Sequence, residues 1–458
     1  MCIRSRGAGM SLPPGPGPKR NNETLMTRNH RPKAECLERH AQTLRRVDRQ
    51  VHHALAAVGL HMTGSPFHWS EDPRKPDLIS ALVGVFVAGL IPLLVGPTAG
   101  AKSLLLEAML RLLVGPRLSV IWCSAYLDPS IFERIVATRS GPAIADRDFG
   151  VALALEEITK NLGGAPVTTV KRLLSHNFAF VGMTGNWLGA RYHTEPPDES
   201  LVSRTAAFAV HEATTVADRH ARLDQRLLSP GDVSGLGPLL DVEGRPAFHA
   251  LLEAREDLAM VPIEDEALEF LLVADSAACV HRGGGSAAHQ GERCSSCSCH
   301  AASACGTLPP VPNLGMRLSA LARATALRLA APGQPPIVDA ELLRLWLPAL
   351  TTPEQRIAPV KDRSHAADRA LAWWDGLVEA TGSFKSRFGD LLEQLEDRPD
   401  RALTTPQRLA VEAFSASVNP NPVALLDLAR IRGRRQRDLH REESVVTPDT
   451  ALSLAGKE

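Results

Sequence analysis

The stretch that decides the fold of this 458-residue chain is Leu93-Leu94-Val95-Gly96-Pro97-Thr98-Ala99-Gly100-Ala101-Lys102-Ser103-Leu104. Its apolar start predicts a strand, its small residues predict a loop, and its last three residues predict the start of a helix. Backbone N–H groups of such a loop and the positive end of a helix favour a phosphate. Lys102 would reach the β and γ oxygens, and the Ser103 hydroxyl would bind Mg²⁺. The strict motif has glycine where this chain has Ala101, so the motif alone leaves nucleotide binding open.

The residues before this loop, from Leu78 to Pro97, are almost continuously apolar and long enough to suggest a membrane-spanning helix. However, Pro92 interrupts the stretch, and the stretch leads directly into the loop. This pattern favours a buried helix followed by a buried parallel strand, and we expect no membrane partner.

Two later apolar runs end in polar side chains that suit nucleotide chemistry. The run Val151 to Leu155 is followed by Glu156 and Glu157, which could hold Mg²⁺ and activate an attacking water. The alternative is a buried strand that enters a helix capped by glutamate. The run from Phe180 ends at Asn186, which could orient the attacking water or could be an ordinary turn residue.

Apolar runs that alternate with helical patterns predict a parallel α/β sheet. These runs are Pro92–Val95, Ser119–Cys123, Val151–Leu155 and Phe178–Met183. Beyond Arg226 the patterns become helical. We therefore expect a disordered arm at residues 1–45, an α/β nucleotide-binding core at 46–225, an α-helical lid at 226–355 with a Cys-rich insertion at about 279–310, and a helical C-terminal region at 356–458.

From about Arg45 to Ile357 the chain resembles the MoxR family of AAA+ ATPases. In this family alanine before the lysine of the phosphate loop is common. The resemblance is carried, in order, by Gly96–Ser103, Gly141–Ile144 with Leu153–Lys160, Thr184 with Asn186, Pro196–Leu201 before Arg204, Val261–Leu268 and Gly315–Ser319.

The resemblance implies a P-loop NTPase core of the AAA+ kind that uses ATP and Mg²⁺. Lys102 would bind phosphate, Ser103 and Glu156 would hold Mg²⁺, Glu157 would activate the attacking water, and Asn186 would orient that water. Arg204 would be an arginine finger that acts on the neighbouring subunit, and Arg317 would sense the nucleotide of its own subunit. The resemblance further implies a ring, typically a hexamer, that remodels a client protein in a chaperone-like role, often with a partner that carries a von Willebrand A domain.

Three departures from the family pattern bear on hydrolysis. Glu156 stands where an aspartate is usual and is one methylene longer, which could move the Mg²⁺ shell. Ala99-Gly100 replaces the usual Gly-Thr order, and Val202-Ser203-Arg204-Thr205 replaces the usual Asp-Arg-Phe. A nucleotide-binding scaffold without turnover is therefore the alternative to an ATPase.

Five of the eight cysteines fall in one segment, and two of them form a Cys-x-x-Cys pair. Such a pair is half of a common zinc site, and the other ligands are ambiguous. A Cys-bearing disordered loop, a disulfide and a redox pair are the alternatives. The zinc candidates are Cys279, Cys294, Cys297, Cys299, His300 and Cys305.

The amino-acid composition limits the classes of partner that we expect. Lys plus Arg and Asp plus Glu both number 51, so no overall field attracts nucleic acid. The basic run Arg430 to Arg437 could contact DNA, but we expect a solvated helix end or a mobile tail. We expect Trp373 and Trp374 in a helical core rather than as a stacking platform. No apolar signal-peptide core follows Arg6, so we expect a cytoplasmic protein.

Overall fold

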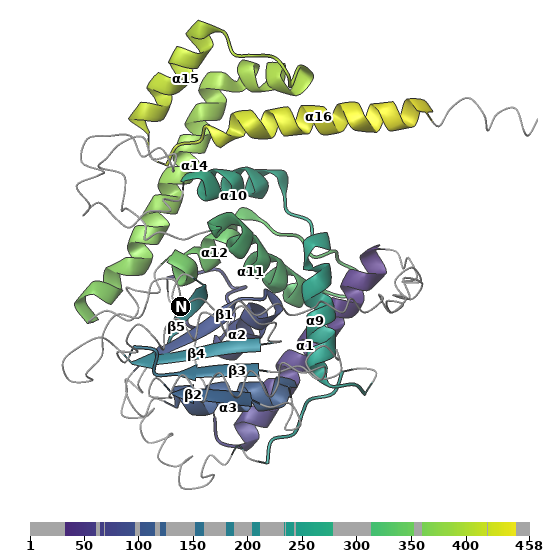
Figure 1. The fold of residues 1–458 in the computed structure, drawn as a ribbon, viewed down its shortest axis with the longest axis vertical. Coiled ribbons are helices and arrows are strands. Elements are labelled where there is room, and N and C mark those ends of the chain that lie inside the picture. The colour runs from purple at the N-terminus through teal and green to yellow at the C-terminus, as the bar shows by residue number, and fades with distance from the viewer. Residues whose placement is uncertain are drawn as a thin grey trace, which may run out of the picture.

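The computed structural model describes residues 33–60, 65–67, 69–96, 101–114, 120–124, 152–159, 180–186, 204–210, 233, 235–241, 244–277, 313–351, 360–418 and 420–445. Its centre is a sheet of five strands in the order β2-β3-β4-β1-β5, and every neighbouring pair is parallel (Figure 1). The strands are β1 (Ile91–Gly96), β2 (Val120–Ser124), β3 (Ala152–Glu156), β4 (Phe180–Asn186) and β5 (Thr205–Ala209).

Strands β1 to β4 coincide with the four apolar runs that the sequence predicts. Strand β5 was not predicted, because its sequence Thr-Ala-Ala-Phe-Ala is dominated by alanine, which is depleted in strands. Pairing with a neighbouring strand, rather than the local sequence, makes this segment a strand. Strand β5 pairs with β1 from Ile91↔Thr205 to Val95↔Ala209. Strand β1 therefore lies between β4 and β5.

The apolar stretch before the loop forms two buried elements. Helix α2 (Leu78–Val87) is buried at all ten positions, and β1 follows it directly. Asp77 caps α2 by accepting a hydrogen bond from the backbone N–H of Ser80 at 2.8 Å. The prediction of a buried helix followed by a buried strand is confirmed. Among the described residues, no helix is long and apolar enough to cross a membrane.

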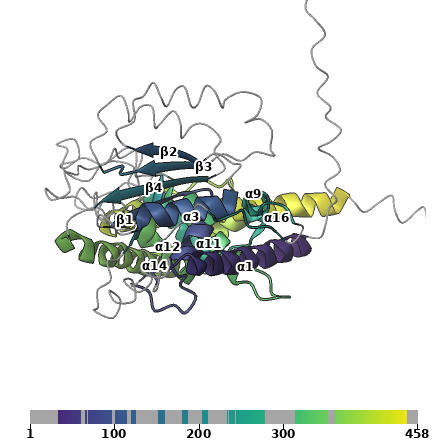
Figure 2. The same cartoon turned by 90° about the horizontal axis from the view of Figure 1, so that it is seen from below.

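The expected N-terminal arm is wrong over its last part, because helix α1 extends from Lys33 to Ala57. Buried Leu37, Ala41 and Leu44 continue toward the N-terminus the helical spacing that the sequence shows from Val47 onward. Polar residues between them concealed this pattern. Figure 2 shows α1 and α3 (Lys102–Val114) on the same side of strands β2, β3 and β4.

Helices follow the sheet, as expected. They are α9 (Ala247–Asp257), the 3-10 helix η3 (Leu258–Met260), α10 (Asp265–Ala277), α11 (Leu314–Leu329), α12 (Ala340–Thr351), α14 (Val360–Asp397), α15 (Thr405–Ser417) and α16 (Ala424–Val445). The predicted α/β architecture is confirmed: a parallel sheet flanked by helices and followed by helical regions.

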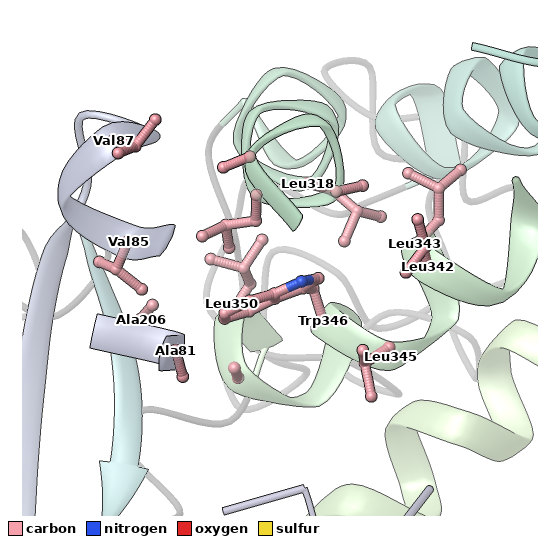
Figure 3. Packing of buried hydrophobic residues seen from close by; sticks show 14 of the residues in the cluster. Ala81, Val85, Val87, Ala206, Leu318, Leu342, Leu343, Leu345, Trp346 and Leu350 are labelled. Atoms are coloured by element: carbon pink, nitrogen blue, oxygen red, sulfur yellow. The ribbon is translucent and has the colours of Figure 1, made fainter. Parts of the chain in front are cut away.

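Trp346 joins the helical region to the sheet region. Its ring, on α12, is fully buried and lies among Leu318 of α11, Val85 of α2 and Ala206 of β5 (Figure 3). Its indole N–H donates to Thr325 Oγ1 at 2.8 Å, so the one polar atom of the ring is satisfied. Burial of one large aromatic against both regions makes their apolar core continuous.

Helices α14 and α16 pack against α10, in the upper part of Figure 1. Buried Glu269 of α10 accepts from Lys385 of α14 at 2.8 Å and from Arg432 of α16 at 2.9 Å. Trp373 and Trp374 are buried in this region, and Trp374 meets the ring of Phe270 edge-on at 6.0 Å between centroids. The prediction that the two tryptophans belong to a core is confirmed.

Candidate functional site

The candidate site lies where three strands end at one edge of the sheet. Gly96 ends β1, Glu156 ends β3 and Asn186 ends β4, and Gly96 is paired with Asn186. Carboxyl ends of parallel strands meet at the same edge, and ligands of open α/β sheets bind there. The topology thus assembles side chains that the sequence separates by up to ninety positions.

Lys102, the first residue of α3, occupies the middle of this edge. Its Nζ donates to the Gly96 carbonyl oxygen at 3.1 Å and to Asn186 Oδ1 at 3.1 Å. The side chain is buried, with 7% of the residue exposed. Burial lowers the pKa of Lys102 to about 8, and the nearby Glu157 carboxylate partly offsets this effect. An anion placed against Nζ would stabilise the charged form.

Small residues bring the start of α3 to this edge. A Cβ on Gly182 of β4 would lie 2.3 Å from Leu106 Cδ1, so a larger residue there would require the Leu106 side chain of α3 to move. A Cβ on Gly96 would lie 2.6 Å from the carbonyl oxygen of Val210, which follows β5. Glycine at 96 is therefore required by the sheet as well as by the loop.

Asn186 is held by both neighbouring elements. Only 5% of the residue is exposed, and its backbone N–H donates to Thr159 Oγ1 at 2.9 Å. Its side-chain oxygen accepts from Lys102, which fixes the amide so that its NH₂ group faces away from the ammonium. The role of Thr159 could not be predicted from the sequence, because it depends on a contact with a residue 27 positions away.

Glu157 follows β3 directly and has a backbone φ of +55°. This is the left-handed region, which residues other than glycine seldom adopt. Its backbone N–H donates to Thr184 Oγ1 at 3.3 Å, and the N–H of Ile158 donates to the Thr184 carbonyl at 3.0 Å. These contacts with β4 hold the strained turn. Strain of this kind collects at functional positions, where a fixed side-chain direction is needed.

Ala101, where the strict motif has glycine, has φ +58°. Its carbonyl oxygen accepts the first hydrogen bond of α3, from the N–H of Leu105 at 2.8 Å. The preference of the motif for glycine thus has a physical cause here, since alanine in this conformation costs about 1 kcal/mol. Ser103 and Leu104 lie in the first turn of α3, whereas the loop residues Pro97, Thr98, Ala99 and Gly100 lie outside the described residues.

Arg204 is exposed and lies at the opposite edge of the sheet. It directly precedes Thr205, which is paired with Ile91 at the start of β1. Five residues of strand separate Ile91 from Gly96, a distance of about 16 Å. Arg204 therefore does not reach the Lys102 site of its own chain.

Arg317 of α11 lies beside the start of β5, and its expected role as a sensor of the nucleotide stays a prediction. Its Nη2 donates to the Thr205 carbonyl oxygen at 2.6 Å, and 6% of the residue is exposed. Burial lowers the pKa of this guanidinium to about 10. In this arrangement Arg317 joins α11 to the first residue of β5.

The structure describes the residues predicted to bind Mg²⁺ but not those predicted to bind zinc. Ser103 and Glu156, the candidates for Mg²⁺, are both half-buried, at the start of α3 and the end of β3. The zinc candidates from Cys279 to Cys305 all lie outside the described residues.

No protein-family model matches this chain, and no curated protein matches it. Among solved structures, the chain is similar to a "putative ATPase" from Cytophaga hutchinsonii ATCC 33406, with 13% sequence identity and a TM-score of 0.43. The likeness covers 68% of this chain and 87% of that chain. At this level it assigns no activity, and the description of the fold rests on strand order and register.

Proposed function

We propose that this chain is an ATP-binding and ATP-hydrolysing AAA+ ATPase of the MoxR type. The observation that carries the proposal is the position of Lys102, a buried lysine that follows the phosphate-loop sequence and lies between the ends of β1 and β4 beside Glu157. Two of its hydrogen bonds go to uncharged oxygens, and burial disfavours its charge. A triphosphate bound at this edge would stabilise the charged form of Lys102.

The residues at this edge fit Mg²⁺ by their donor chemistry. A serine hydroxyl at 103 and a carboxylate at 156 are oxygen donors, which Mg²⁺ prefers, and phosphate oxygens and water complete such sites. The bound ion would neutralise charge on the phosphates. The chain itself would supply Lys102 as a phosphate ligand, Glu157 as a base for the attacking water and Asn186 as the group that orients this water.

Arg204 supports action between subunits. It is exposed and lies about 16 Å from its own phosphate-binding edge, so it could serve only the site of another chain. A head-to-tail contact of this kind forms a ring when the rotation between neighbouring subunits closes. A hexameric ring that remodels a client protein, with a von Willebrand A domain protein as partner, is part of the proposal and rests on the resemblance of the sequence.

A scaffold that binds nucleotide without turnover is the competing function. Glu156 in the place of aspartate and the strained backbone of Ala101 are the observations that favour it. Action on DNA has less support, since Arg432 pairs with Glu269 at 2.9 Å and Arg437 pairs with Asp400 at 2.9 Å. In these contacts, arginines of the basic run hold α16 against neighbouring parts of the fold.

Phosphate release from ATP and Mg²⁺ by the purified chain tests the proposal. We expect release by the parent chain and its loss in Lys102→Ala, Glu157→Gln and Arg204→Ala. Arg408→Ala changes an arginine on α15 and serves as the control with unchanged release. Nucleotide binding without release in the parent chain would support the scaffold instead.

A further inference from the structure

Three side chains of metal-binding types converge far from Lys102. Cys36 and His40 lie one turn apart on α1, and Asp257 is the last residue of α9. The Cys36 Sγ lies 3.4 Å from His40 Nε2 and 3.2 Å from Asp257 Oδ2, and Nε2 lies 2.9 Å from Oδ2. This is the one group of three such side chains found within the described residues.

The separations match those of ligands around one tetrahedral ion. Zinc lies about 2.3 Å from sulfur and about 2.0 to 2.2 Å from nitrogen or carboxylate oxygen, so its ligand atoms lie about 3.3 to 3.6 Å apart. The observed separations of 3.4, 3.2 and 2.9 Å are at or slightly below this range. Small side-chain movements would admit an ion at the centre.

The arrangement differs from that of a catalytic thiol. In a Cys-His-Asp triad the two ring nitrogens contact different partners, whereas here Nε2 faces both Sγ and Oδ2. A chain of hydrogen bonds through three groups also needs only two contacts. Here all three pairs are close, so the three atoms form a closed triangle around one point.

We propose that Cys36, His40 and Asp257 bind a divalent transition-metal ion, with Zn²⁺ as the physiological ion and water as the fourth ligand. Thiolate, imidazole and carboxylate together suit zinc better than Mg²⁺ or Ca²⁺. His40 is 2% exposed, so its ring is held in place by the surrounding residues. Cys36 and Asp257 are half-buried and leave access for the ion and for water.

The ion would join two helices that are remote in sequence. Helices α1 and α9 lie side by side (Figure 1), and 217 positions separate His40 from Asp257. A metal bound only in the folded chain stabilises the fold by its binding free energy. The site would therefore attach the N-terminal helix to the start of the helical region.

Cobalt substitution of the full-length chain tests this inference, because a thiolate bound to Co²⁺ gives a charge-transfer band in the near ultraviolet. Serine replaces Cys279, Cys294, Cys297, Cys299 and Cys305 in the background chain, so that the Cys-rich segment does not contribute. We expect about one Co²⁺ per chain with this band, displaced by Zn²⁺. Cys36→Ser should abolish the band, Asp257→Asn should weaken metal binding at least about tenfold, and the matched thiol variant Cys2→Ser should leave the band unchanged.

Thermal unfolding with and without a chelator gives a second readout. We expect the chelator to lower the Tm of the zinc-loaded background chain and to leave the Tm of Cys36→Ser unchanged. Far-ultraviolet circular dichroism establishes that Cys36→Ser is folded. A band that is absent, or that persists in folded Cys36→Ser, would overturn the proposal and identify the three side chains as a hydrogen-bonded group alone.

Discussion

Lys102 Nζ lies 3.1 Å from Asn186 Oδ1, so the residue proposed to bind phosphate directly contacts the residue proposed to orient the attacking water. The Asn186 side chain is an uncharged amide, so it places no negative charge beside the ammonium. We predict that Asn186→Asp weakens binding of a non-hydrolysable ATP analogue at least about tenfold, because a carboxylate would pair with Lys102 and repel phosphate.

The control for this prediction is Asn186→Ala, measured by isothermal titration calorimetry beside Asn186→Asp. The alanine variant should bind the analogue within about threefold of the parent chain, because it adds no competing charge, and should lose turnover. Equal binding by the two variants would show that Lys102 does not meet the phosphates.

A second prediction concerns the uptake of a proton by Lys102 when nucleotide binds. Because burial lowers the pKa of Lys102 to about 8 and bound phosphate would raise it, binding at pH 8.5 should take up a proton. At pH 6.5 the lysine is already charged, so its contribution to uptake should vanish. Calorimetry in buffers of different ionisation enthalpy measures this uptake. Lys102→Arg, which stays charged at both pH values, should show none from this position, and buffer-independent heats in the parent chain at pH 8.5 would exclude this role.

The strained backbone of Glu157 leads to a third prediction. Glu157→Gly and Glu157→Ala both remove the carboxylate, and only glycine accepts φ +55° without strain. We expect both variants to lack turnover, and the free energy of unfolding of the glycine variant to exceed that of the alanine variant by about 1 kcal/mol. Urea unfolding measures the difference, and an equal or lower value for glycine would show that the turn carries no strain.

The contact of α1 with α2 should depend on pH. His52 Nε2 lies 2.9 Å from Asp77 Oδ2, and its Nδ1 lies 2.7 Å from the Asp48 carbonyl oxygen. The hydrogen bond to Asp77 is the main cause that raises the pKa of His52 from 6.5 to about 9. The charged form of His52 therefore stabilises the folded state. This stabilisation is fully present below pH 6.5 and is lost as pH rises through 9.

Because a third of the His52 side chain is exposed, we expect a loss of only about 1 kcal/mol in unfolding free energy between these pH values. Urea unfolding of the parent chain and of His52→Gln, at both pH values, isolates this contribution from other titrating groups. A pH dependence that is the same in the two proteins would contradict the assignment.

Local patterns predicted much of the sheet region. Continuous apolar runs at β1 to β4 are typical of strands buried on both faces, and they predicted these four strands. The polar residues that follow the runs were predicted as site residues, and the structure brings Lys102 and Asn186 into contact. Strand β5 and the first part of α1 were missed, because alanine-rich and polar-rich stretches give weak local signals. Pairing with β1 and burial of Leu37 decide these elements.

Contacts between remote side chains could not be predicted. The role of Thr159 depends on the approach of the ends of β3 and β4, and Arg317 contacts a carbonyl oxygen 112 positions away. Cys36 and His40 share one helical face at a spacing that suits metal ligands. Their third partner, Asp257, becomes visible only when α9 packs beside α1.

A mixture of two inactive variants tests the central claim most directly. Glu157→Gln keeps Arg204 but loses its own catalytic base, whereas Arg204→Ala keeps the base but lacks the arginine for its neighbour. In randomly mixed rings about a quarter of the interfaces would combine an intact site with an intact arginine. We predict that each variant alone releases no phosphate and that the mixture regains about this fraction of the parent rate. A mixture as inactive as its components would contradict an ATPase site that Arg204 completes from the neighbouring subunit.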